Sequence, residues 1–432
     1  METIITGMGI WSCIGTSLPE VTQSLREGKS GIGHILERAE YGYQSTLSGI
    51  VPPVPDSLIS DLPRHIRICM GEPARYAYMA VLQAIRQADL TNLRNVALIV
   101  SNDSTAGALA ETEEVMQERH DTRYLGAGKV FQSLNSTVSM NLASIFHIGG
   151  LTITLSAACA GGGHAIGIAH SLIESGMVDC AIVVGAQEAG LHAYTSFDAL
   201  GLFSREASRP FDKNRSGLVP SGGAAAIVLE SKYHYYNRME GYIDSPCFPL
   251  ASIIGYGYST SQSIVTPRKD SILATMTLAL ANAERHEHKV IPAFSLSMIS
   301  AHATGTRDGD RAEAEAITSF IDHSKMGYDE SRVKDMSPWI SSTKSLTGHE
   351  CWMSGVSQMV YTLLQAHNNF VAPNPNLSEP DESCATLRIA RETTPWHTAR
   401  YVLLNAFGFG GTNSSIAIRV STIPYGGMAH IT

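Results

Sequence analysis

The chain has 432 residues, of which 44% are hydrophobic and 16% charged, a composition typical of a soluble globular protein with a large buried core. Its formal net charge is −9, and Lys and Arg never occur in runs longer than a pair, which argues against a nucleic-acid partner. No basic signal-peptide start and no apolar stretch of the roughly 18 residues of a membrane helix occurs, and the scattered cysteines form no CxxC pair. These features predict a reduced, cytoplasmic protein without a membrane span.

Apolar runs typical of strands alternate with helical patterns through the whole chain, which predicts a layered α/β fold. In chain order we expect a strand at 3–7, a helix at 72–88, strands at 95–101 and 152–156, a helix at 160–175, strands at 180–185, 224–230 and 251–257, a helix at 271–283, a strand at 294–300, a helix at 311–320, a strand at 339–342, a helix at 355–366, and strands at 401–405 and 415–420. Residues 106–134 have the weakest pattern and are interpreted as an insertion or a segment that faces a partner.

The expected elements suggest a weak internal repeat. A strand ends at Ser101 in the first half and at His302 in the second, and a strand leads into a turn and a helix at Cys159 and again near His349. The simplest interpretation is two similar halves, residues 1–250 and 251–432, whose helix-opening turns face each other. Residues of the two turns would then meet at one site.

Residues 155–164, LSAACAGGGH, place a cysteine in a turn between a strand and a helix. The free N–H groups and the dipole of a helix N-terminus favour a thiolate, and the three glycines would leave room for a substrate near the backbone. Cys159 is therefore a candidate nucleophile. A small cysteine buried in a tight turn is an equally good interpretation of this segment alone.

Residues 302–313, HATGTRDGDRAE, begin with a histidine at the end of an apolar strand. Strand ends present catalytic groups, but a lone histidine in such a place is more often a hydrogen-bonded core residue. Asp310 and Glu313 have the spacing of a capping box, so we expect Asp310 mainly to start the helix at 311–320.

Two further segments could contribute to a site. Residues 342–349, STKSLTGH, place His349 at a helix start, with Lys344 either on the surface or as a tethered cation that tunes its neighbours. Residues 405–413, NAFGFGGTN, form a glycine-rich turn whose N–H groups would suit an oxyanion hole, although a simple turn between strands explains them as well.

Other motifs do not support cofactor or metal chemistry. Gly7 and Gly9 lack the third glycine of a dinucleotide-binding turn, and His286 and His288 flank Glu287 in a charged segment that we expect to be solvated. The sequence has no phosphate-binding GxxxxGK[ST] loop and no HExxH pair. We therefore expect no metal site and no cofactor.

Together, the four segments resemble the motif set of the β-ketoacyl-acyl carrier protein synthases, the Cys-His-His condensing enzymes of the thiolase-like superfamily. Residues 209–217, RPFDKNRSG, match a further motif of that family. The resemblance implies a duplicated five-layer α-β-α-β-α fold and a dimer. It also implies a 3-oxoacyl-acyl carrier protein synthase that condenses malonyl-acyl carrier protein, with loss of carbon dioxide, with an acyl group held on the cysteine.

The resemblance also implies residue roles. Cys159 would carry the acyl group, N–H groups of Cys159 and Phe409 would bind the carbonyl oxygen, His302 and His349 would assist decarboxylation, and Lys344 would orient the two histidines. Five side chains would contribute to the substrate pocket or the polar network beside it: Phe197, Thr304, Thr306, Glu313 and Phe407. Arg64 and Arg67 lie where relatives contact the acidic acyl carrier protein.

The sequence departs from the family pattern at several places. Ala303 and Ser216 replace the usual Gly and Asp, and residues 101–105 stand where a glycine-rich turn is common. Most unusual are residues 350–354, ECWMS, where the family has small residues. These changes suggest an altered acyl pocket or an altered subunit interface. The sequence does not indicate whether Trp352 and Met353 face the pocket or the interface. The changes also suggest a specialised polyketide or polyene pathway.

Two other functions compete with this interpretation. A thiolase or coenzyme A-primed synthase has another residue type in place of His349. A non-catalytic chain-length factor, the partner subunit in a ketosynthase heterodimer, generally lacks the nucleophile. The presence of Cys159 together with both histidines favours the enzyme, as a homodimer or as a heterodimer with a related subunit.

Overall fold

The computed structural model describes all residues except 104, 241–247, 266, 334, 398–399 and 423–432. Its main feature is an 11-stranded sheet in the order β12-β10-β9-β14-β15-β8-β1-β7-β6-β4-β5. The strands of the first half are β1 Thr3–Ser12, β4 Ala97–Ser101, β5 Thr152–Leu155, β6 Cys180–Gln187 and β7 Gly223–Ser231. Those of the second half are β8 Ala251–Thr260, β9 Met298–Ser300, β10 Trp339–Ser341, β12 Arg388–Ile389, β14 Tyr401–Phe407 and β15 Thr412–Val420.

The two halves of the sheet repeat one topology. In the first half β4 lies parallel to β5 and β6, and β6 pairs antiparallel with β7. In the second half β9 lies parallel to β10 and β14, and β14 pairs antiparallel with β15. The halves join where Thr3 to Ile5 of β1 pair antiparallel with Ile253 to Ala251 of β8. The repeated pattern of strands noticed in the sequence is thus present in the fold.

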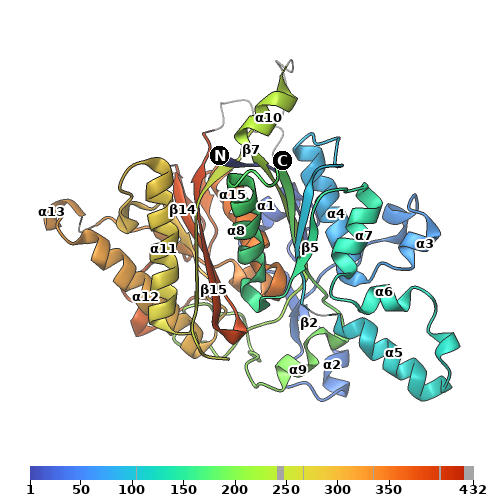
Figure 1. Cartoon of the computed structure of the whole chain (residues 1–432). Helices are drawn as coiled ribbons and strands as arrows, with labels where there is room; N and C mark the ends of the chain where they lie inside the picture. Colours follow the sequence, from blue (N-terminus) through green and yellow to red (C-terminus); the bar gives the residue numbers. More distant parts are fainter. Residues whose placement is uncertain (104, 241–247, 266, 334, 398–399, 423–432) are drawn as a thin grey trace.

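Helices complete five layers, which Figure 1 shows nearly edge-on. Helices α1 Leu18–Glu27, α8 Gly161–Glu174 and α15 Ser354–His367 lie between the two halves of the sheet. Helices α4 Glu72–Gln87 and α7 Thr137–Phe146 cover the outer face of the first half, and α11 Lys269–Glu287 and α12 Arg307–Lys325 cover that of the second. Because α15 is enclosed by both halves, all of its residues are buried. The predicted α/β fold of the thiolase-like type is confirmed.

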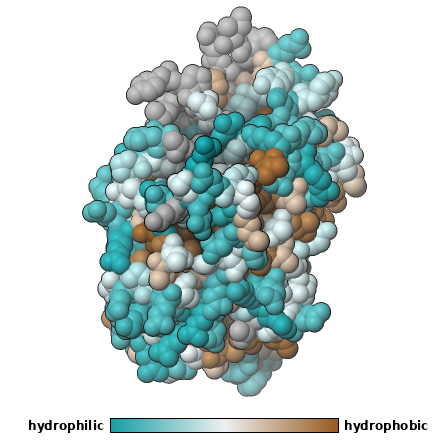
Figure 2. All heavy atoms as spheres, turned by 90° about the vertical axis from the view of Figure 1, so that its left-hand side faces the viewer, coloured by the Kyte–Doolittle hydropathy of each residue, from teal (hydrophilic) through white to brown (hydrophobic). Residues whose placement is uncertain are grey.

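Shorter elements occupy the periphery. The helices are α2 Glu37–Glu40, α3 Arg64–Arg67, α5 Ala106–Arg119, α6 Lys129–Ser133, α9 Thr195–Asp198, α10 Lys232–Met239, α13 Glu330–Val333 and α14 Lys344–Thr347. Two small sheets pair β2 Ile32–His34 with β3 Leu47–Gly49 and β11 Phe370–Val371 with β13 Thr394–Pro395. The outer face of the second half is largely hydrophilic, with hydrophobic side chains in separate spots (Figure 2). No helix within the described part of the chain is both long and apolar enough to cross a membrane.

Glycines let the central layers approach closely. A Cβ atom on Gly355 of α15 would lie 2.1 Å from the backbone nitrogen of Gly163 in α8, so the two helices cross at glycine. Gly7 and Gly9 lie within β1, and a Cβ atom on either would lie 2.1 Å from a carbonyl oxygen of α4. These two glycines therefore let α4 pack directly against β1. The strand continues to Ser12, beyond the predicted end at residue 7, because it pairs with β7 as far as Ser12 and Gly223.

Some boundaries differ from the predictions. The strand expected at 294–300 begins only at Met298, because Ala293–Ser295 form a 3-10 turn after Pro292. Residues 106–134, which gave the weakest pattern, contain α5 and α6. No residue of α5 is buried, so this helix has no apolar stripe to recognise.

Candidate active site

A cavity of about 380 Å³ opens between the two halves of the fold. Its lining includes eight of the residues singled out from the sequence: Cys159, Phe197, His302, Thr304, Thr306, His349, Phe407 and Phe409. Glu313 also reaches the cavity, whereas Lys344 lies behind the wall and Arg64 and Arg67 lie elsewhere, on α3. Thus the motifs from both halves meet at one place.

Cys159 lies in a strained turn at the start of α8. The 3-10 turn Ala158–Ala160 leads directly into the helix, and Ala158 has a φ of +47°, a conformation that side-chain-bearing residues rarely adopt. The carboxylate Oδ2 of Asp103 accepts the N–H of Ala158 at 2.8 Å and so helps to hold this conformation. Cys159 is only 5% exposed, yet its thiol still lines the cavity.

His349 contacts the cysteine directly. Its Nε2 lies 3.0 Å from Sγ of Cys159, and its Nδ1 lies 3.3 Å from the hydroxyl of Ser354. The main chain of His349 is fixed to the first half, because its N–H donates to Val219 O at 2.7 Å and its carbonyl accepts the N–H of Ser221 at 2.9 Å. The first half therefore fixes the position of a histidine that belongs to the second.

His302 lies beside this pair. Its ring is 5.3 Å from that of His349 at an interplanar angle of 88°, and 5.7 Å from that of Phe407. Burial lowers the pKa of His302 well below its usual value, and the positive charge of Lys344 and the neighbouring His349 lower it further. His302 is therefore neutral at physiological pH, with its Nδ1 free of any hydrogen-bond partner among the described residues.

Glu313 fixes the main chain at His302. Its two carboxylate oxygens accept the N–H groups of His302 at 2.8 Å and Ala303 at 2.7 Å, and the amide of Asn405 donates to it at 3.1 Å. Burial raises the pKa of Glu313 to about 7. Its role is thus to position the loop that carries His302, not to cap a helix.

Lys344 is a buried cation, as one of the two interpretations of the sequence held. It is 2% exposed, and its Nζ lies 3.5 Å from the amide oxygen of Gln358. Burial lowers the pKa of Lys344 to about 8, although the carboxyl groups of Glu313 and Glu350 favour the charged form.

These groups favour a thiolate at Cys159. A hydrogen bond from the Cys351 thiol lowers the pKa of Cys159 most, and His349 and Lys344 lower it further, against the opposing effect of burial. The net pKa lies well below that of an ordinary thiol, which is the property that a nucleophilic cysteine needs.

The glycine-rich turn lies against the nucleophile. The 3-10 turn Phe409–Gly411 joins β14 to β15, and a Cβ atom on Gly408 would lie 3.1 Å from Ala157 O and from Ala160 N, on either side of Cys159. The N–H of Gly408 donates to Thr412 O at 2.8 Å, and that of Gly410 to Ile264 O at 2.7 Å, so the turn is held in place. This fixes the backbone at Phe409 close to Cys159, as an oxyanion hole requires.

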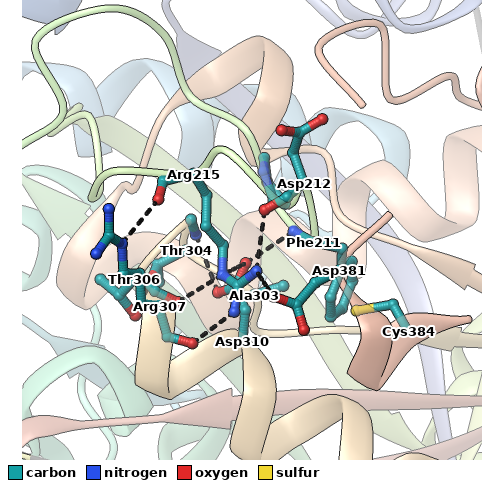
Figure 3. Close-up of polar contacts among 12 residues, drawn as sticks. Phe211, Asp212, Arg215, Ala303, Thr304, Thr306, Arg307, Asp310, Asp381 and Cys384 are labelled. Carbon is teal, nitrogen blue, oxygen red and sulfur yellow. Dashed lines mark hydrogen bonds and ion pairs between the residues drawn. The ribbon is translucent and has the colours of Figure 1, made fainter. Parts of the chain in front are cut away.

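A buried ion network supports the wall of the cavity (Figure 3). Arg215, only 1% exposed, donates to the carbonyl oxygens of Thr306 at 3.1 Å and Arg307 at 2.6 Å and to the carboxylate of Asp381 at 2.8 Å. Asp310 lies beside it and accepts N–H groups of Phe211 at 2.8 Å and Gly305 at 3.0 Å. The segment 209–217 is thereby attached to the loop that follows His302.

Two of the expectations from sequence are wrong. Asp310 does not start a helix, because α12 begins at Arg307 and Asp310 lies inside it. The glycines after Cys159 do not leave room for a substrate, because Ser101 fills the space at Gly161 and α15 fills it at Gly162.

Outside this site, Glu287 is not a simply solvated residue. It accepts hydrogen bonds from Tyr401 at 2.8 Å and from Arg419 at 2.6 Å. In the described part of the chain, one group has metal-ligand geometry, namely Cys180, Glu230 and His234. Both carboxylate oxygens of Glu230 already accept hydrogen bonds from Arg238, at 2.6 and 2.7 Å, which leaves little reason to expect a cation there.

Several residues of the site were missed as functional candidates. They are Asp103 below the nucleophile turn, Cys351 beside the thiol, and Tyr194, Phe203 and Leu218 in the cavity wall. Cys351 and Asp103 lie within segments that were noted for departing from a family pattern, and this was the one available signal. The three wall residues lie in segments without any catalytic motif.

The comparisons with known proteins agree with this geometry. The model of the β-ketoacyl synthase N-terminal domain matches residues 2–234, and that of the C-terminal domain matches residues 250–378. The 3-oxoacyl-[acyl-carrier-protein] synthase 1 of Haemophilus influenzae is 33% identical over 431 residues, which cover 97% of this chain and 98% of that protein.

Solved structures of similar fold cover nearly the whole chain. A β-ketoacyl synthase from Burkholderia phymatum STM815 superposes with a TM-score of 0.84 at 27% identity, covering 98% of this chain and 100% of that one. The ishigamide ketosynthase/chain length factor gives a TM-score of 0.84 at 26% identity, covering 98% and 99%. With both family models matched in order and a full-length relative above 30% identity, the chain belongs to the β-ketoacyl synthase family of condensing enzymes.

Proposed function

We propose that this chain is a 3-oxoacyl-acyl carrier protein synthase that uses Cys159 as its nucleophile. The contact of 3.0 Å between Nε2 of His349 and Sγ of Cys159, with the ring of neutral His302 beside it, is the observation that supports this most directly. The full-length relatives named as synthases acting on acyl carrier protein support the same substrate class.

In the first half-reaction, the Cys159 thiolate attacks the thioester carbonyl of an acyl carrier protein. The N–H groups of Cys159 and Phe409 stabilise the negative oxygen, and the bond between the carbonyl carbon and the carrier-protein sulfur breaks. The carrier protein leaves as a thiolate and takes up the proton that the Cys159 thiol released when it ionised. The acyl group is then held as a thioester on Cys159. The lowered pKa of this thiol allows attack without a separate base.

In the second half-reaction, malonyl-acyl carrier protein loses carbon dioxide. His302 and His349 stabilise the enolate that forms, and its carbon attacks the acyl group on Cys159. The carbon–sulfur bond breaks and releases the Cys159 thiolate, and a 3-oxoacyl product two carbons longer leaves on the carrier protein. One proton taken up from solvent balances the carboxylate that was lost as carbon dioxide. The electron pair of the new carbon–carbon bond comes from the bond that breaks when the malonyl carboxylate leaves as carbon dioxide, so the step involves no net oxidation or reduction.

The test is intact-mass analysis of the purified protein after incubation with acyl-carrier-protein thioesters and then with malonyl-carrier protein. We expect an acyl mass on Cys159 that disappears on malonyl addition, together with an elongated product. Cys159→Ala should take up no acyl group, and His302→Ala should take it up but not elongate it. If no donor acylates the wild type, alone or with a related subunit, the chain is not a synthase but the pocket-shaping partner.

The partners follow from the same proposal. Arg64 is exposed on α3, and Arg67 beside it is partly exposed, so this short helix offers positive charge to an acidic carrier protein. We also propose a dimer, formed at the free edge of β5 by a second copy or a related subunit, and a cytoplasmic location. A specialised polyketide or polyene pathway would account for the bulky residues at 350–354.

A further inference from the structure

The cavity has two chemically different regions. At its mouth lie Arg307 and Asp308, which are polar and solvent-exposed. Near Cys159 the lining is instead apolar and mostly buried, and it belongs to one hydrophobic cluster with the cysteine. The members that reach the cavity are Tyr194, Phe197, Phe203, Leu218 and Cys351. An acyl chain on Cys159 is more favourably placed along this apolar wall than at the polar mouth.

Trp352 belongs to the same cluster but stands behind the wall. Its ring centroid lies 5.9 Å from that of Phe197, and it directly follows Cys351 in the chain. Trp352 is not among the residues that line the cavity, whereas its neighbours Phe197 and Cys351 are. Trp352 is only 6% exposed in the isolated chain, so it is buried without any partner subunit.

The indole is held firmly in this place. Ser101 donates its hydroxyl to the carbonyl of Trp352 at 2.9 Å, and the next residue, Met353, is fully buried against Gly185 of β6. The Nε1 atom of Trp352 is buried and has no acceptor among the described residues. Since a buried indole N–H normally finds a partner, the contribution of Trp352 must lie in its size and its ring faces.

We propose that Trp352 closes the inner end of the acyl-binding region and sets the longest acyl chain that the enzyme accepts. The inference rests on the proposed function, because it requires an acyl group on Cys159. Phe197 packs against both Trp352 and Phe409, and its ring centroid lies 6.1 Å from that of Phe409, so Trp352 supports the ring that lines the cavity beside the glycine-rich turn. A smaller side chain at position 352 would let Phe197 or Cys351 move back and lengthen the channel.

The experiment measures acylation of Cys159 from carrier-protein donors of four to sixteen saturated carbons. Wild type is compared with Trp352→Phe, Trp352→Leu and Trp352→Ala, a graded series in which the first is conservative enough to fold. The control is Trp396→Phe together with Trp396→Ala. Trp396 is also buried, its Nε1 also has no partner among the described residues, and it lies in the central core and not in the lining of the cavity. The readout is the ratio of rates for long and short donors within each variant.

We expect this ratio to rise by about tenfold or more in Trp352→Ala for donors just beyond the wild-type limit, with smaller rises for Leu and Phe. The Trp396 variants should keep the wild-type limit. An unchanged limit across the Trp352 series, with Cys159 still acylated by short donors, would overturn the inference but leave the proposed function intact. If no donor acylates the wild type, the result contradicts the proposed function itself, and the inference about Trp352 falls with it.

Discussion

Cys351 is the residue whose effect on the nucleophile is least expected, since it is itself a cysteine. The Cys351 thiol lies 3.7 Å from the carbonyl oxygen of His349. A hydrogen bond from this thiol is the largest of the effects that lower the pKa of Cys159, while the pKa of Cys351 itself is raised well above the usual value. The two shifts together favour ionisation of Cys159 over ionisation of Cys351. This arrangement leads to a direct prediction.

Replacing Cys351 by Ala should raise the pKa of Cys159, because the thiolate loses its donor. We expect the pH at which iodoacetamide alkylates Cys159 at half its maximal rate to move upward, which alkylation rates followed by peptide mass spectrometry would measure. Cys384→Ala is the matched control, because Cys384 is also buried but bonds to Ser383, outside the cavity. Identical alkylation profiles for all three proteins would show that Cys351 has no such role.

The charge of Lys344 leads to a second prediction, which concerns the pH dependence of activity. Burial penalises its charged form and lowers its pKa to about 8, so the cation is present below that pH and is lost above it. Condensation activity should therefore fall as the pH rises through about 8, when the charge that favours the thiolate and neutral His302 disappears. Lys344→Met should be about tenfold less active at pH 7 and should lack this alkaline fall. Activity profiles of equal shape in both proteins would refute the assignment.

At the scale of elements, Glu230 and the arginine bound to it connect the strands β1 and β7 and the helices α4 and α10. It lies in β7, accepts hydrogen bonds from Thr6 of β1 at 2.5 Å and from Arg238 of α10 at 2.6 and 2.7 Å, and pairs with His234 at 2.7 Å. Arg238 also donates to the carbonyl of Ala88, the residue that ends α4, at 2.7 Å. Burial alone would raise the pKa of Glu230, but Arg238 and His234 hold it at about 2.

The stability of the fold should depend on this carboxylate. Because its pKa in the folded state is below its ordinary value, its contribution is complete above about pH 4.5 and disappears as the pH falls towards 2. Glu230→Gln should lower the free energy of unfolding by about 3 kcal/mol at pH 7, and this difference should shrink on acidification. Urea unfolding at several pH values measures it, with Glu111→Gln as a control, because the ion pair of Glu111 with Lys129 is largely exposed on the Glu111 side. A difference that does not vary with pH would contradict the role.

The helices and strands could be predicted from the sequence only in part. Strand–turn–helix patterns located the turns at Cys159 and His349, because apolar strands and glycine-rich turns are local signals. The helix at 106–119 was not predicted, because none of its residues is buried and it therefore has no apolar face in the sequence. The end of β1 depends on its pairing with β7, and the start of α12 is bound by Arg215, and both partners are distant in sequence.

The site was predictable only in part for a similar reason. Cys159, His302 and His349 belong to distinctive motifs, and the structure brings them together. Whether Trp352 faced the pocket or an interface depends on packing between three segments, including the one around Ser101, and no local pattern contains that information.

For the whole molecule, the proposed dimer interface lies at the edge of the large sheet formed by β5. Leu98 in β4 donates its N–H to the carbonyl of Leu151, the residue before β5. Asn102, just after β4, donates its N–H to the carbonyl of Leu155, the last residue of β5. Because successive residues of a strand face opposite ways, the N–H and C=O groups of Thr152 and Thr154 point away from β4, towards the free edge. Such an edge is a template for pairing with a second strand.

For the dimer proposed above, Thr154→Pro should shift the equilibrium towards the monomer, because it removes one outward N–H without breaking the pairing with β4. Light scattering coupled to size-exclusion chromatography would measure the mass. The substitution also removes the hydrogen bond of 2.7 Å between the hydroxyls of Thr154 and Ser139, and Ser139→Ala controls for that loss. A dimer that survives in Thr154→Pro would place the interface elsewhere.

Recognition of the carrier protein is also a property of the whole surface. In a chain of net charge −9, an acidic partner should approach through a local positive region. We expect the double variant Arg64→Glu and Arg67→Glu to raise KM for carrier-protein substrates by about tenfold and to leave kcat nearly unchanged. Arg332→Glu, an exposed arginine on α13, is the control. Equal KM values would rule out α3 as the docking site.

The glycine crossing of α8 and α15 has a consequence for recombination between relatives. Gly162 and Gly163 come from the half that carries the nucleophile, and Gly355 comes from the half that carries both histidines. A chimera that joins the first half of this chain to the second half of another synthase would keep its catalytic residues but could not dock if its counterpart of Gly355 bore a side chain. Halves of this enzyme are thus exchangeable only among chains that share this crossing, whatever their substrates.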